Sequence, residues 1–351
     1  MYIGSASASW PRLNNHPSLD PVTPPVAPLA NDLRLIEGIR LWARAPVAPF
    51  TTIGTGGSAG LLVTVATPRS LAAALARIVT SGCAWTCLGA GSNLLVADRG
   101  YPGILIKLDE EFHYVEGLPS VLEKSGAQVS LTVGGGAYLT RLSAVAAEAG
   151  LSGLEFACGI PGSVGGGVST NAGAHGWSLA DVVEEVEISS GSGLRWMPAD
   201  ALECGYRYCR LPEDSIVTAV RMRLTSGDRT AILEQHRSLL RKRRTTQPRA
   251  ARTFGSVFKN PPGEPAGRLL EAAGLKGVRR GGAEVSRVHA NFVVNLGDAT
   301  TTDVLTLMSL MRQGVHRSSG ILLEPEVRLL GAAFPWESLP AVSQGLPDPD
   351  G

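Results

Sequence analysis

One uncharged, glycine-rich stretch limits what this chain can fold into more than any other segment. Residues 159–174 read GIPGSVGGGVSTNAGA and hold six glycines without one charged side chain. Glycine loses more backbone freedom on folding than any other residue. Apolar residues such as Ile160 and Val164 are interspersed and serine is sparse, which argues against a flexible linker. Tight turns without a chemical role are the other plain interpretation. We expect instead a site where backbone N–H groups approach a ligand closely.

The charge balance and the cysteine pattern bound the class of protein. Lys and Arg together number 32 against 31 for Asp and Glu, so no strong field points to nucleic acid or an anionic membrane. No apolar run approaches the roughly 20 residues of a membrane span, and the N-terminus does not read as a secretion signal. The five cysteines form no CxxC pair and no zinc-type group, so we expect reduced thiols and no bound metal. These features predict a cytoplasmic protein without membrane insertion.

The order of apolar patterns along the chain predicts an α+β protein. Thr67 can cap a helix that has Pro68 at its first position and ends at Gly82. Residues 1–30 are rich in Pro, Ser and Asn and predict a disordered tail. Strands are expected at 61–66, 84–91, 104–108, 129–136, 182–189, 194–200 and 216–224, and further helices at 33–43, 137–149, 232–244, 266–273 and 302–316.

A dense basic run, RKRR at 241–244, ends the long helical pattern. Basic side chains at a helix C-terminus are favoured by the helix dipole, so a solvated helix end is one interpretation. A contact to a substrate phosphate is the alternative. The domain break is expected near residue 226, before this helix.

Three glycine-rich segments precede that break. Residues 54–60, GTGGSAG, satisfy the letter of a nicotinamide-dinucleotide motif but precede a strand instead of following one. Residues 88–96, LGAGSNLLV, follow a strand directly, so their N–H groups can form a concave anion site. Residues 159–174 lack the Gly-Lys-Ser of a P-loop. Three uncharged backbone cradles suit a long dinucleotide with a bulky ring system, which points to a flavin.

Seven segments resemble one family in their sequence and their order. They are GAGSNLLV, GLEFACGIPGSVGGGVSTNAGAHG, GYRY, GSVFKNPPG, AGRLLEAAGLKG, GGAEVSRVHANFVVN and LEPEVRLLG. Together they are similar to the UDP-N-acetylenolpyruvoylglucosamine reductases, also called UDP-N-acetylmuramate dehydrogenases, over roughly residues 45–331. The short spacing between GYRY and GSVFKNP resembles the second type in the family. The first family motif departs here, with Thr51 for an asparagine and Gly54 for an arginine, which leaves the backbone of Gly56 and Gly57 as the expected contacts there.

The resemblance implies an FAD-binding fold of the vanillyl-alcohol oxidase and p-cresol methylhydroxylase kind. It implies two α+β subdomains and a C-terminal α+β substrate-binding domain. The expected parts are a tail at 1–30, an FAD-binding domain at 31–225 with an internal break near 110, a substrate domain at 226–331 and a tail at 332–351.

The resemblance also implies non-covalent FAD, NADPH as hydride donor and UDP-N-acetylglucosamine enolpyruvate as substrate, in peptidoglycan precursor synthesis by a monomer. His175 is expected to be a packing or hydrogen-bonding residue and not a covalent flavin link. The expected cofactor contacts are Gly56, Gly57, Gly89, Ala90, Gly91, Ser92, Asn93, Gly159, Ile160, Pro161, Gly162, Ser163, Gly165, Gly166, Asn171 and Gly173.

Three side chains match the catalytic positions of the family. Ser256 is the expected proton donor, Arg207 faces the substrate carboxylate because a guanidinium can grip both oxygens, and Glu326 is the third member. Glu324, two residues away, stays open as an alternative to Glu326. Lys259 and Asn260 are the expected substrate-binding residues, with contacts to the diphosphate and the uridine.

Three other functions remain open at this point. One is a flavin oxidase of the same fold that acts on a sugar or an alcohol. Another is a non-catalytic nucleotide-sugar-binding protein, which has no need of a proton donor. The last is a nicotinamide-dependent dehydrogenase without flavin, and it rests only on GTGGSAG.

Overall fold

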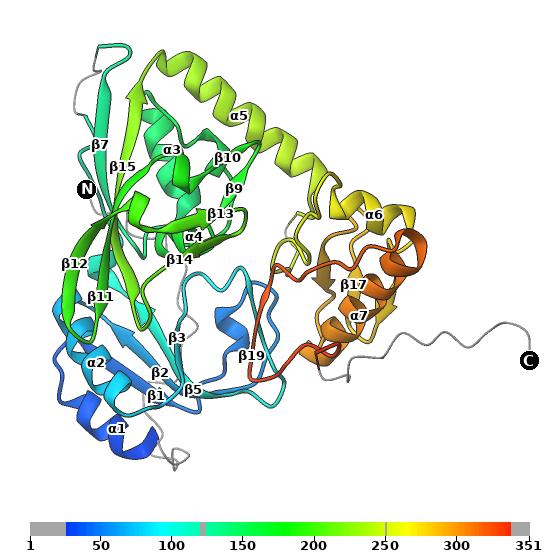
Figure 1. The fold of residues 1–351 in the computed structure, drawn as a ribbon, viewed down its shortest axis with the longest axis horizontal. Coiled ribbons are helices and arrows are strands. Elements are labelled where there is room, and N and C mark those ends of the chain that lie inside the picture. Colours follow the sequence, from blue (N-terminus) through cyan, green and yellow to red (C-terminus); the bar gives the residue numbers. More distant parts are fainter. Residues whose placement is uncertain (1–25, 120–123, 250, 338–351) are drawn as a thin grey trace, which may run out of the picture.

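A four-stranded mixed sheet forms the first part of the molecule. The computed structural model describes residues 26–119, 124–249 and 251–337. The strand order is β1-β2-β5-β3, with β1 antiparallel to β2 and the other pairs parallel (Figure 1). The elements are β1 (Ile39–Ala43), β2 (Ala59–Val65), β3 (Trp85–Cys87) and β5 (Tyr101–Leu108), with α1 (Val26–Arg34), α2 (Pro68–Thr80) and the 3-10 turns η1 (Ala48–Phe50) and η2 (Glu110–Phe112).

The first sheet is held by apolar faces and a clear helix cap. All seven residues of β2 are buried, as expected for a central strand covered on both faces. Thr67 accepts a hydrogen bond from the N–H of Ser70, and Pro68 opens α2, so the expected cap is confirmed. The strand–helix–strand unit predicted from the sequence is therefore present.

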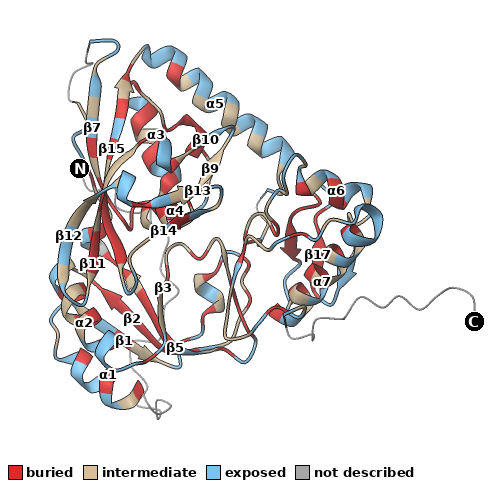
Figure 2. Cartoon of the chain, in the orientation of Figure 1, coloured by how far each residue is buried: buried red, intermediate tan, exposed pale blue. Residues whose placement is uncertain are grey.

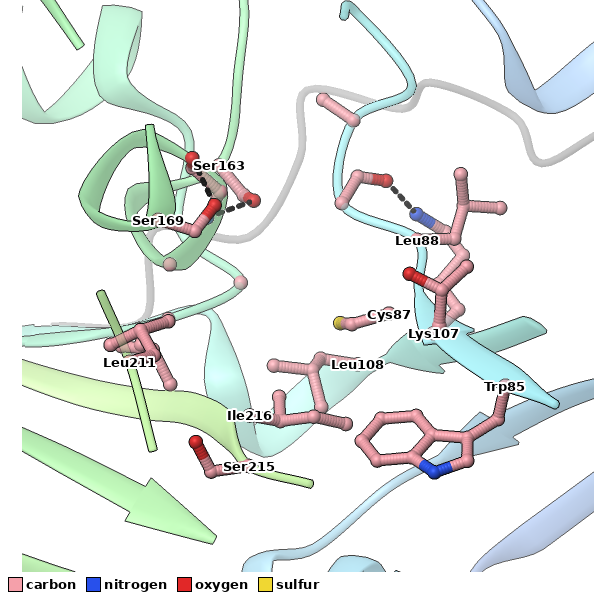
Figure 3. A pocket seen from close by; sticks show the side chains of 18 of the residues that line it. Trp85, Cys87, Leu88, Lys107, Leu108, Ser163, Ser169, Leu211, Ser215 and Ile216 are labelled. Carbon is pink, nitrogen blue, oxygen red and sulfur yellow. Dashed lines mark hydrogen bonds between the residues drawn. The ribbon is translucent and has the colours of Figure 1, made fainter. Parts of the chain in front are cut away.

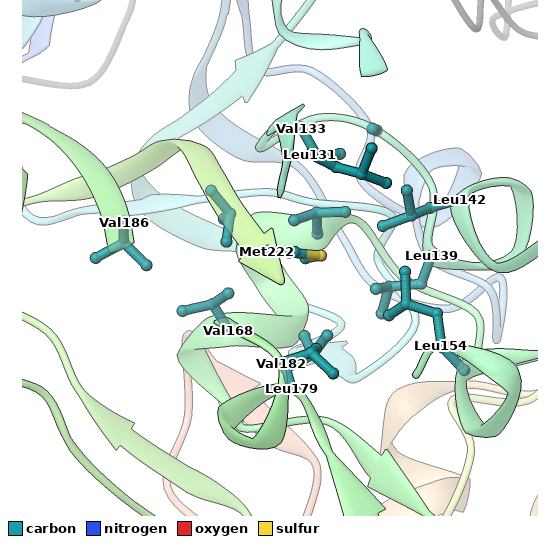
Figure 4. Close-up of a cluster of buried hydrophobic side chains, with 14 of the residues drawn as sticks. Leu131, Val133, Leu139, Leu142, Leu154, Val168, Leu179, Val182, Val186 and Met222 are labelled. Atoms are coloured by element: carbon teal, nitrogen blue, oxygen red, sulfur yellow. The ribbon is translucent and has the colours of Figure 1, made fainter. Parts of the chain in front are cut away.

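A larger sheet forms the second part and carries the glycine-rich stretch. Its order is β12-β11-β15-β7-β6, and β8 also pairs with β15. Residues of β7, β15, α3 and α4 pack in one apolar cluster, in which Met222 lies among Leu131, Val133 and Leu142 (Figure 4). The elements are β6 (Val115–Glu116), β7 (Gln128–Gly134), α3 (Leu139–Glu148), β8 (Leu151–Ser152), η3 (Glu155–Ala157), α4 (Val164–Ser169), β11 (Val183–Ser190), β12 (Gly193–Pro198), β15 (Ile216–Ser226) and α5 (Arg229–Thr246).

Two short hairpins lie between α4 and β15. One is formed by β9 (Gly173–Ala174) and β10 (Trp177–Ser178), the other by β13 (Glu203–Gly205) and β14 (Tyr208–Arg210). The 3-10 turns η4 (Leu179–Asp181) and η5 (Ala199–Ala201) connect them to the sheet. The second hairpin has Tyr206 and Arg207 as its turn.

The third part has its own core, and it is joined to the first part by the start of its second helix and by its last strand. It contains α6 (Ala266–Ala272), α7 (Thr301–Ser319) and the small sheet β16 (Arg279–Arg280), β17 (Ala283–Val285) and β18 (Val293–Asn295). Figure 2 shows that these elements turn buried residues toward one another. Asp98 accepts hydrogen bonds from the N–H groups of Thr301 and Thr302 at the start of α7. Strand β19 (Arg328–Leu330) pairs in parallel with β4 (Leu94–Val96).

The expectations at the two ends of the chain need correction. Residues 33–43 do not form one helix: α1 ends at Arg34, Gly38 turns the chain at a φ of +78°, and β1 follows because it pairs with β2. The predicted N-terminal tail reached residue 30, but Val26, Leu29 and Ala30 are buried in α1. The predicted C-terminal tail began at 332, yet Phe334 is 9% exposed and belongs to the third core. The remainder of both expected tails lies outside the described residues.

The boundary between the FAD-binding and substrate domains, expected between residues 225 and 226, stays a prediction.

Within the described residues, no helix has the length and apolar character needed to cross a membrane.

Shortening Leu33 to Ala should destabilise the protein, because this side chain is fully buried against the first sheet. A buried leucine truncation costs about 2–5 kcal/mol of unfolding free energy. Leu35→Ala is the matched control, since Leu35 is 82% exposed and surface changes stay within about 0.5 kcal/mol. Urea unfolding of both variants measures the difference, and equal midpoints would show that α1 does not belong to this core.

Candidate functional site

Two adjoining cavities run between the two sheets and toward the third part. The first, of about 590 Å³, is lined by Trp85, Lys107 and Ile216 among others, and we call it the Trp85 cavity (Figure 3). The second, of about 300 Å³, reaches Arg207 and Ser256, and we call it the Ser256 cavity. Both are lined by Thr86, Cys87, Leu88, Gly89, Ala90, Ser163, Gly166, Ser169 and Arg328. The shared lining makes one elongated site suited to a long ligand.

The loop at residues 89–93 offers a run of backbone donors to this site. Gly89 and Ala90 line both cavities, and Gly91, Ser92 and Asn93 line the Ser256 cavity. None of their five N–H groups has an acceptor among the residues that the structure describes. Backbone N–H groups near a cavity normally find partners, and successive free N–H groups form a concave site for anions. The loop therefore fits the diphosphate of a dinucleotide such as FAD.

The glycine-rich stretch packs against this loop. Its middle is the short helix α4, capped by Ser163. A Cβ added at Gly89 would lie 2.6 Å from the Ser163 Oγ, and Ser92 donates a hydrogen bond to the carbonyl of Pro161 at 2.6 Å. Part of the demand for glycine in these loops therefore comes from the close approach of the chain to itself.

Gly165 and Gly166 differ in what surrounds them. A Cβ at Gly165 would meet the backbone oxygens of Val217 and Gly135 at 3.0 and 3.2 Å. At Gly166, apart from its chain neighbours and the backbone of α4, a Cβ would meet one atom of the described residues within 4 Å, the Ser163 Oγ at 3.1 Å. Both glycines line the Trp85 cavity. Gly166 is thus the position where a side chain can be added with little effect on the surrounding backbone.

Most of the expected cofactor contacts line one of the two cavities, but four do not. Gly57 is packed on the backbone of Asp98, where a Cβ would come within 2.3 Å of the carbonyl oxygen. Gly56 lies against Val96, and Gly159 against the side chain of Arg243. The residues that line at least one cavity are Gly89, Ala90, Gly91, Ser92, Asn93, Ile160, Pro161, Gly162, Ser163, Gly165, Gly166 and Gly173.

Asn171 is the fourth expected contact outside the two cavities. Its Nδ2 donates to the carbonyl of Gly205, and its Oδ1 accepts from the N–H of Ala180. Both ends of the amide therefore bind groups of the protein, and the role of Asn171 as a cofactor contact stays a prediction.

The three expected catalytic residues line the Ser256 cavity together. Arg207 comes from the β13–β14 turn, Ser256 from the segment that pairs with Phe292, and Glu326 from the segment before β19. The sequence separations among them are large, so the fold alone brings them to one wall. Arg207 has a φ of +62°, a backbone conformation that residues other than glycine rarely adopt.

Arg207 and Glu326 form an ion pair inside this cavity. The Nε of Arg207 lies 2.7 Å from the Oε1 of Glu326, and 23% and 18% of the two side chains are exposed. The N–H does not point along this line, so charge holds the pair more than a linear hydrogen bond does. Burial raises the pKa of Glu326, and the Arg207 charge opposes that rise.

Glu324 has different surroundings, which favours Glu326 of the two. The Glu324 carboxylate lies 3.4 Å from the Lys259 Nζ and its side chain is 75% exposed. Lys259 does not line the Ser256 cavity, although its charge acts on Glu326. Asn260 is exposed, its Oδ1 accepts from the N–H of Ala266, and its own N–H donates to the Tyr206 hydroxyl.

Sequence reasoning gave no firm role to two cations that line the site. Arg243 lines the Ser256 cavity and burial lowers its pKa; it belongs to the basic run at 241–244, whose interpretation as a solvated end missed this one residue. Arg328 lines both cavities and stands two residues after Glu326, which was the available signal.

His175 does not match its expected role. It is exposed in the turn between β9 and β10, with a φ of +57°. Partial burial and the nearby Lys242 and Arg243 lower its pKa.

The cysteines differ in part from the expectation of five reduced thiols. Cys204 and Cys209 are opposite each other in the β13–β14 hairpin and form a disulfide. The sequence spacing of five residues did not reveal the hairpin that brings them together. Cys87 is a free thiol whose sulfur points into the Trp85 cavity (Figure 3). Desolvation raises the pKa of Cys87 to about 11, and the charges of Lys107 and Arg328 oppose this rise.

Comparison with known proteins agrees with a flavin site. Residues 59–196 match the family model described as FAD binding domain. Residues 247–330 match the model described as UDP-N-acetylenolpyruvoylglucosamine reductase, C-terminal domain. The fold and its two cavities therefore define an FAD-dependent oxidoreductase, and the expected fold class is confirmed.

Individual relatives make the family specific. The chain is 46% identical over 290 residues to a UDP-N-acetylenolpyruvoylglucosamine reductase of Anaeromyxobacter sp. (strain Fw109-5), covering 82% of this chain and 87% of the relative. It is 44% identical to UDP-N-acetylenolpyruvoylglucosamine reductase 2 of Symbiobacterium thermophilum, covering 89% and 99%. The crystal structure of the Thermus caldophilus reductase superposes with a TM-score of 0.69 at 37% identity, covering 83% and 98%. The chain belongs to the UDP-N-acetylenolpyruvoylglucosamine reductase family.

Replacing Gly166 by Val should lower the FAD content of the purified protein severalfold while the fold persists. The new side chain would not clash with neighbouring backbone segments, but it would extend toward the cavity. The ratio of flavin to protein absorbance measures the occupancy, and circular dichroism measures the fold. Gly191→Val in the β11–β12 turn is the control. Full occupancy in Gly166→Val would place the cofactor elsewhere.

Replacing Arg207 by Met should raise the pKa of Glu326 further, because the guanidinium opposes the effect of burial. A carboxyl with a raised pKa in the folded state contributes stability that is present below its unfolded pKa and is lost as pH rises through its folded pKa. The variant should therefore lose more stability than the wild type on going from roughly pH 4 to pH 8. Urea midpoints across this range measure the loss.

Two controls accompany this measurement. Arg210→Met removes an arginine of the same hairpin whose partner, Glu203, is well exposed, and it should leave the pH profile unchanged. Adding Glu326→Gln to Arg207→Met should remove the extra pH dependence. A double variant that keeps it would assign the effect to another group.

Proposed function

We propose that Arg207, Ser256 and Glu326 are the catalytic residues of this enzyme. Its family makes it an FAD-dependent oxidoreductase of peptidoglycan precursor synthesis, which reduces the enolpyruvyl group of UDP-N-acetylglucosamine enolpyruvate with NADPH to give UDP-N-acetylmuramate. The observation that carries the proposal is the shared cavity: all three side chains line it, and it continues into the loop of free N–H groups.

The reaction adds a hydride and a proton across one carbon–carbon double bond. FAD, when bound, would supply the hydride chemistry, with NADPH as the hydride donor. What the chain must supply is a proton at the carbon next to the carboxylate and stabilisation of the charge that develops on that carboxylate. Such stabilisation is usually a large part of catalysis.

Ser256 is the proposed proton donor. It is partly exposed and lines the cavity beside Phe254 and Phe292, which are both buried. Ser256 thus lines the cavity next to two buried phenylalanines, and this packing can hold it at a fixed distance from a bound substrate. General acid residues of this kind contribute about 10²–10⁴-fold to the rate.

Arg207 and Glu326 are proposed to bind the developing enolate together. A substrate carboxylate that pairs with Arg207 would weaken the interaction that holds down the pKa of Glu326. Glu326 then takes up a proton and can donate a hydrogen bond to the second oxygen. The ion pair seen between the two residues is in this proposal the state that the substrate replaces.

The rest of the substrate extends toward the third part. Arg243 is a candidate for an anionic group of the substrate, since it lines the same cavity. Lys259 and Asn260 remain proposed contacts of the uridine diphosphate, at the rim next to Tyr206. The proposal includes a monomeric, cytoplasmic enzyme in which the first two parts bind FAD and the third part binds the substrate.

Replacing Ser256 by Ala should slow only the second half of the reaction. Oxidation of the reduced flavin by the UDP-enolpyruvyl sugar should fall by about 10²–10⁴-fold, the usual contribution of a positioned acid. Reduction by NADPH should be unchanged, because that step does not use the proton. Affinity for the sugar should change little, as one neutral hydroxyl is worth about 1 kcal/mol. Stopped-flow absorbance follows the two halves separately.

The matched control is Ser192→Ala in the exposed β11–β12 turn. It should affect neither half. If Ser256→Ala slows the NADPH half instead, Ser256 serves the geometry of the cofactor. If neither half changes, the proton donor is another residue.

A further inference from the structure

A lysine from the first sheet reaches the loop that offers the free N–H groups. Lys107 stands on β5, is partly buried and lines the Trp85 cavity. Its Nζ donates a hydrogen bond to the carbonyl oxygen of Gly89 at 3.0 Å (Figure 3). Burial lowers its pKa, so the protein has moved a cation out of water at this position.

The carbonyls of the same loop are held in an alternating pattern. Gly89 accepts from Lys107, Gly91 accepts from the backbone N–H of Thr52 at 3.0 Å, and Asn93 accepts from the N–H of Arg328 at 3.2 Å. The intervening N–H groups have no acceptor within the described residues. Alternate carbonyl oxygens of the loop thus accept hydrogen bonds from the protein, and its N–H groups are left to bind a ligand.

The planar peptide bond connects these two facts. In a trans peptide the carbonyl of one residue and the N–H of the next point in opposite directions. When Lys107 holds the Gly89 oxygen, the N–H of Ala90 is directed away from the lysine. Without that bond the same peptide could turn its oxygen toward a phosphate, which would repel it.

Several other charges surround Lys107. Asp109 attracts it but is also ion-paired with Arg40. His113, whose pKa burial lowers, contributes no fixed charge when neutral. The remaining charged lining residues of the Trp85 cavity are Arg328 and Asp214. Lys107 contacts the loop through its charged side chain, whereas Arg328 contacts it through its backbone N–H.

We propose that Lys107 is a positioning residue for the diphosphate of FAD. It fixes the Gly89 carbonyl so that the 89–93 loop presents its N–H groups, and its positive charge favours the dianion from the other side of that peptide. This role concerns how strongly FAD is held, so it stands apart from the catalytic roles of Arg207, Ser256 and Glu326.

Binding of FAD and of riboflavin to the full-length chain tests this role, because riboflavin has the same ring system without the diphosphate. Lys107→Met should weaken FAD binding at least 10-fold and leave riboflavin binding within about 2-fold of the wild type. Lys107→Gln keeps a donor to Gly89 without the charge, so its FAD affinity should lie between those of Lys107→Met and the wild type. Lys107→Arg keeps the charge and should restore most of the affinity. Quenching of flavin fluorescence measures all four proteins.

Lys124→Met is the control for loss of one positive charge, since Lys124 is exposed and outside both cavities. It should bind both flavins as the wild type does. Unchanged FAD affinity in Lys107→Met would overturn the proposal. Equal losses for FAD and riboflavin would also overturn it, because they would show a general role in the shape of the cavity. If Lys107→Met does not fold, the same two comparisons in Lys107→Gln decide the question.

Discussion

The site depends on a parallel pair of three-residue strands. Strand β19 pairs with β4, so that Arg328 is opposite Leu94 and Leu330 is opposite Val96. The same contact continues upstream, where the Asn93 side chain donates to the carbonyl of Glu326. The loop that offers N–H groups for a diphosphate is thereby joined directly to the segment that carries Glu326, the carboxylate that we propose as catalytic. Without this pair the third part would have its own core but would not complete the Ser256 cavity.

Arg207 is placed by a hairpin that accepts local strain. Its left-handed backbone costs about 1–3 kcal/mol for a residue with a side chain, and the rest of the hairpin offsets it. The Cys204–Cys209 disulfide closes the two strands, and Asn171 holds the carbonyl of Gly205. The strain occurs at the residue that must point into the cavity, which is where such conformations persist when the surroundings enforce them.

The long elements and the motif residues could be predicted from the sequence, whereas the short elements could not. Helix α2 follows from Thr67 and Pro68, and β2 from its apolar run, because those signals are local. The chain at 33–43 was misassigned since β1 is an edge strand defined by its partner. Lys107 gave no signal, because its hydrogen bond to Gly89 depends on how a neighbouring strand and loop are stacked. For Gly56 and Gly57 the structure adds a reason for glycine that the motif did not reveal, because a Cβ there would meet the chain at Val96, Asp98 and Gly100.

The position of β19 so late in the chain has a consequence for how the protein is made. The ribosome releases residues 89–93 and 159–174 long before residues 326–330, and domains generally begin to fold as they emerge. A growing chain therefore contains both glycine-rich segments while Glu326 and the strand that places it are still unsynthesised. Competence for the complete reaction begins only when the last of these residues has been added and β19 has docked on β4.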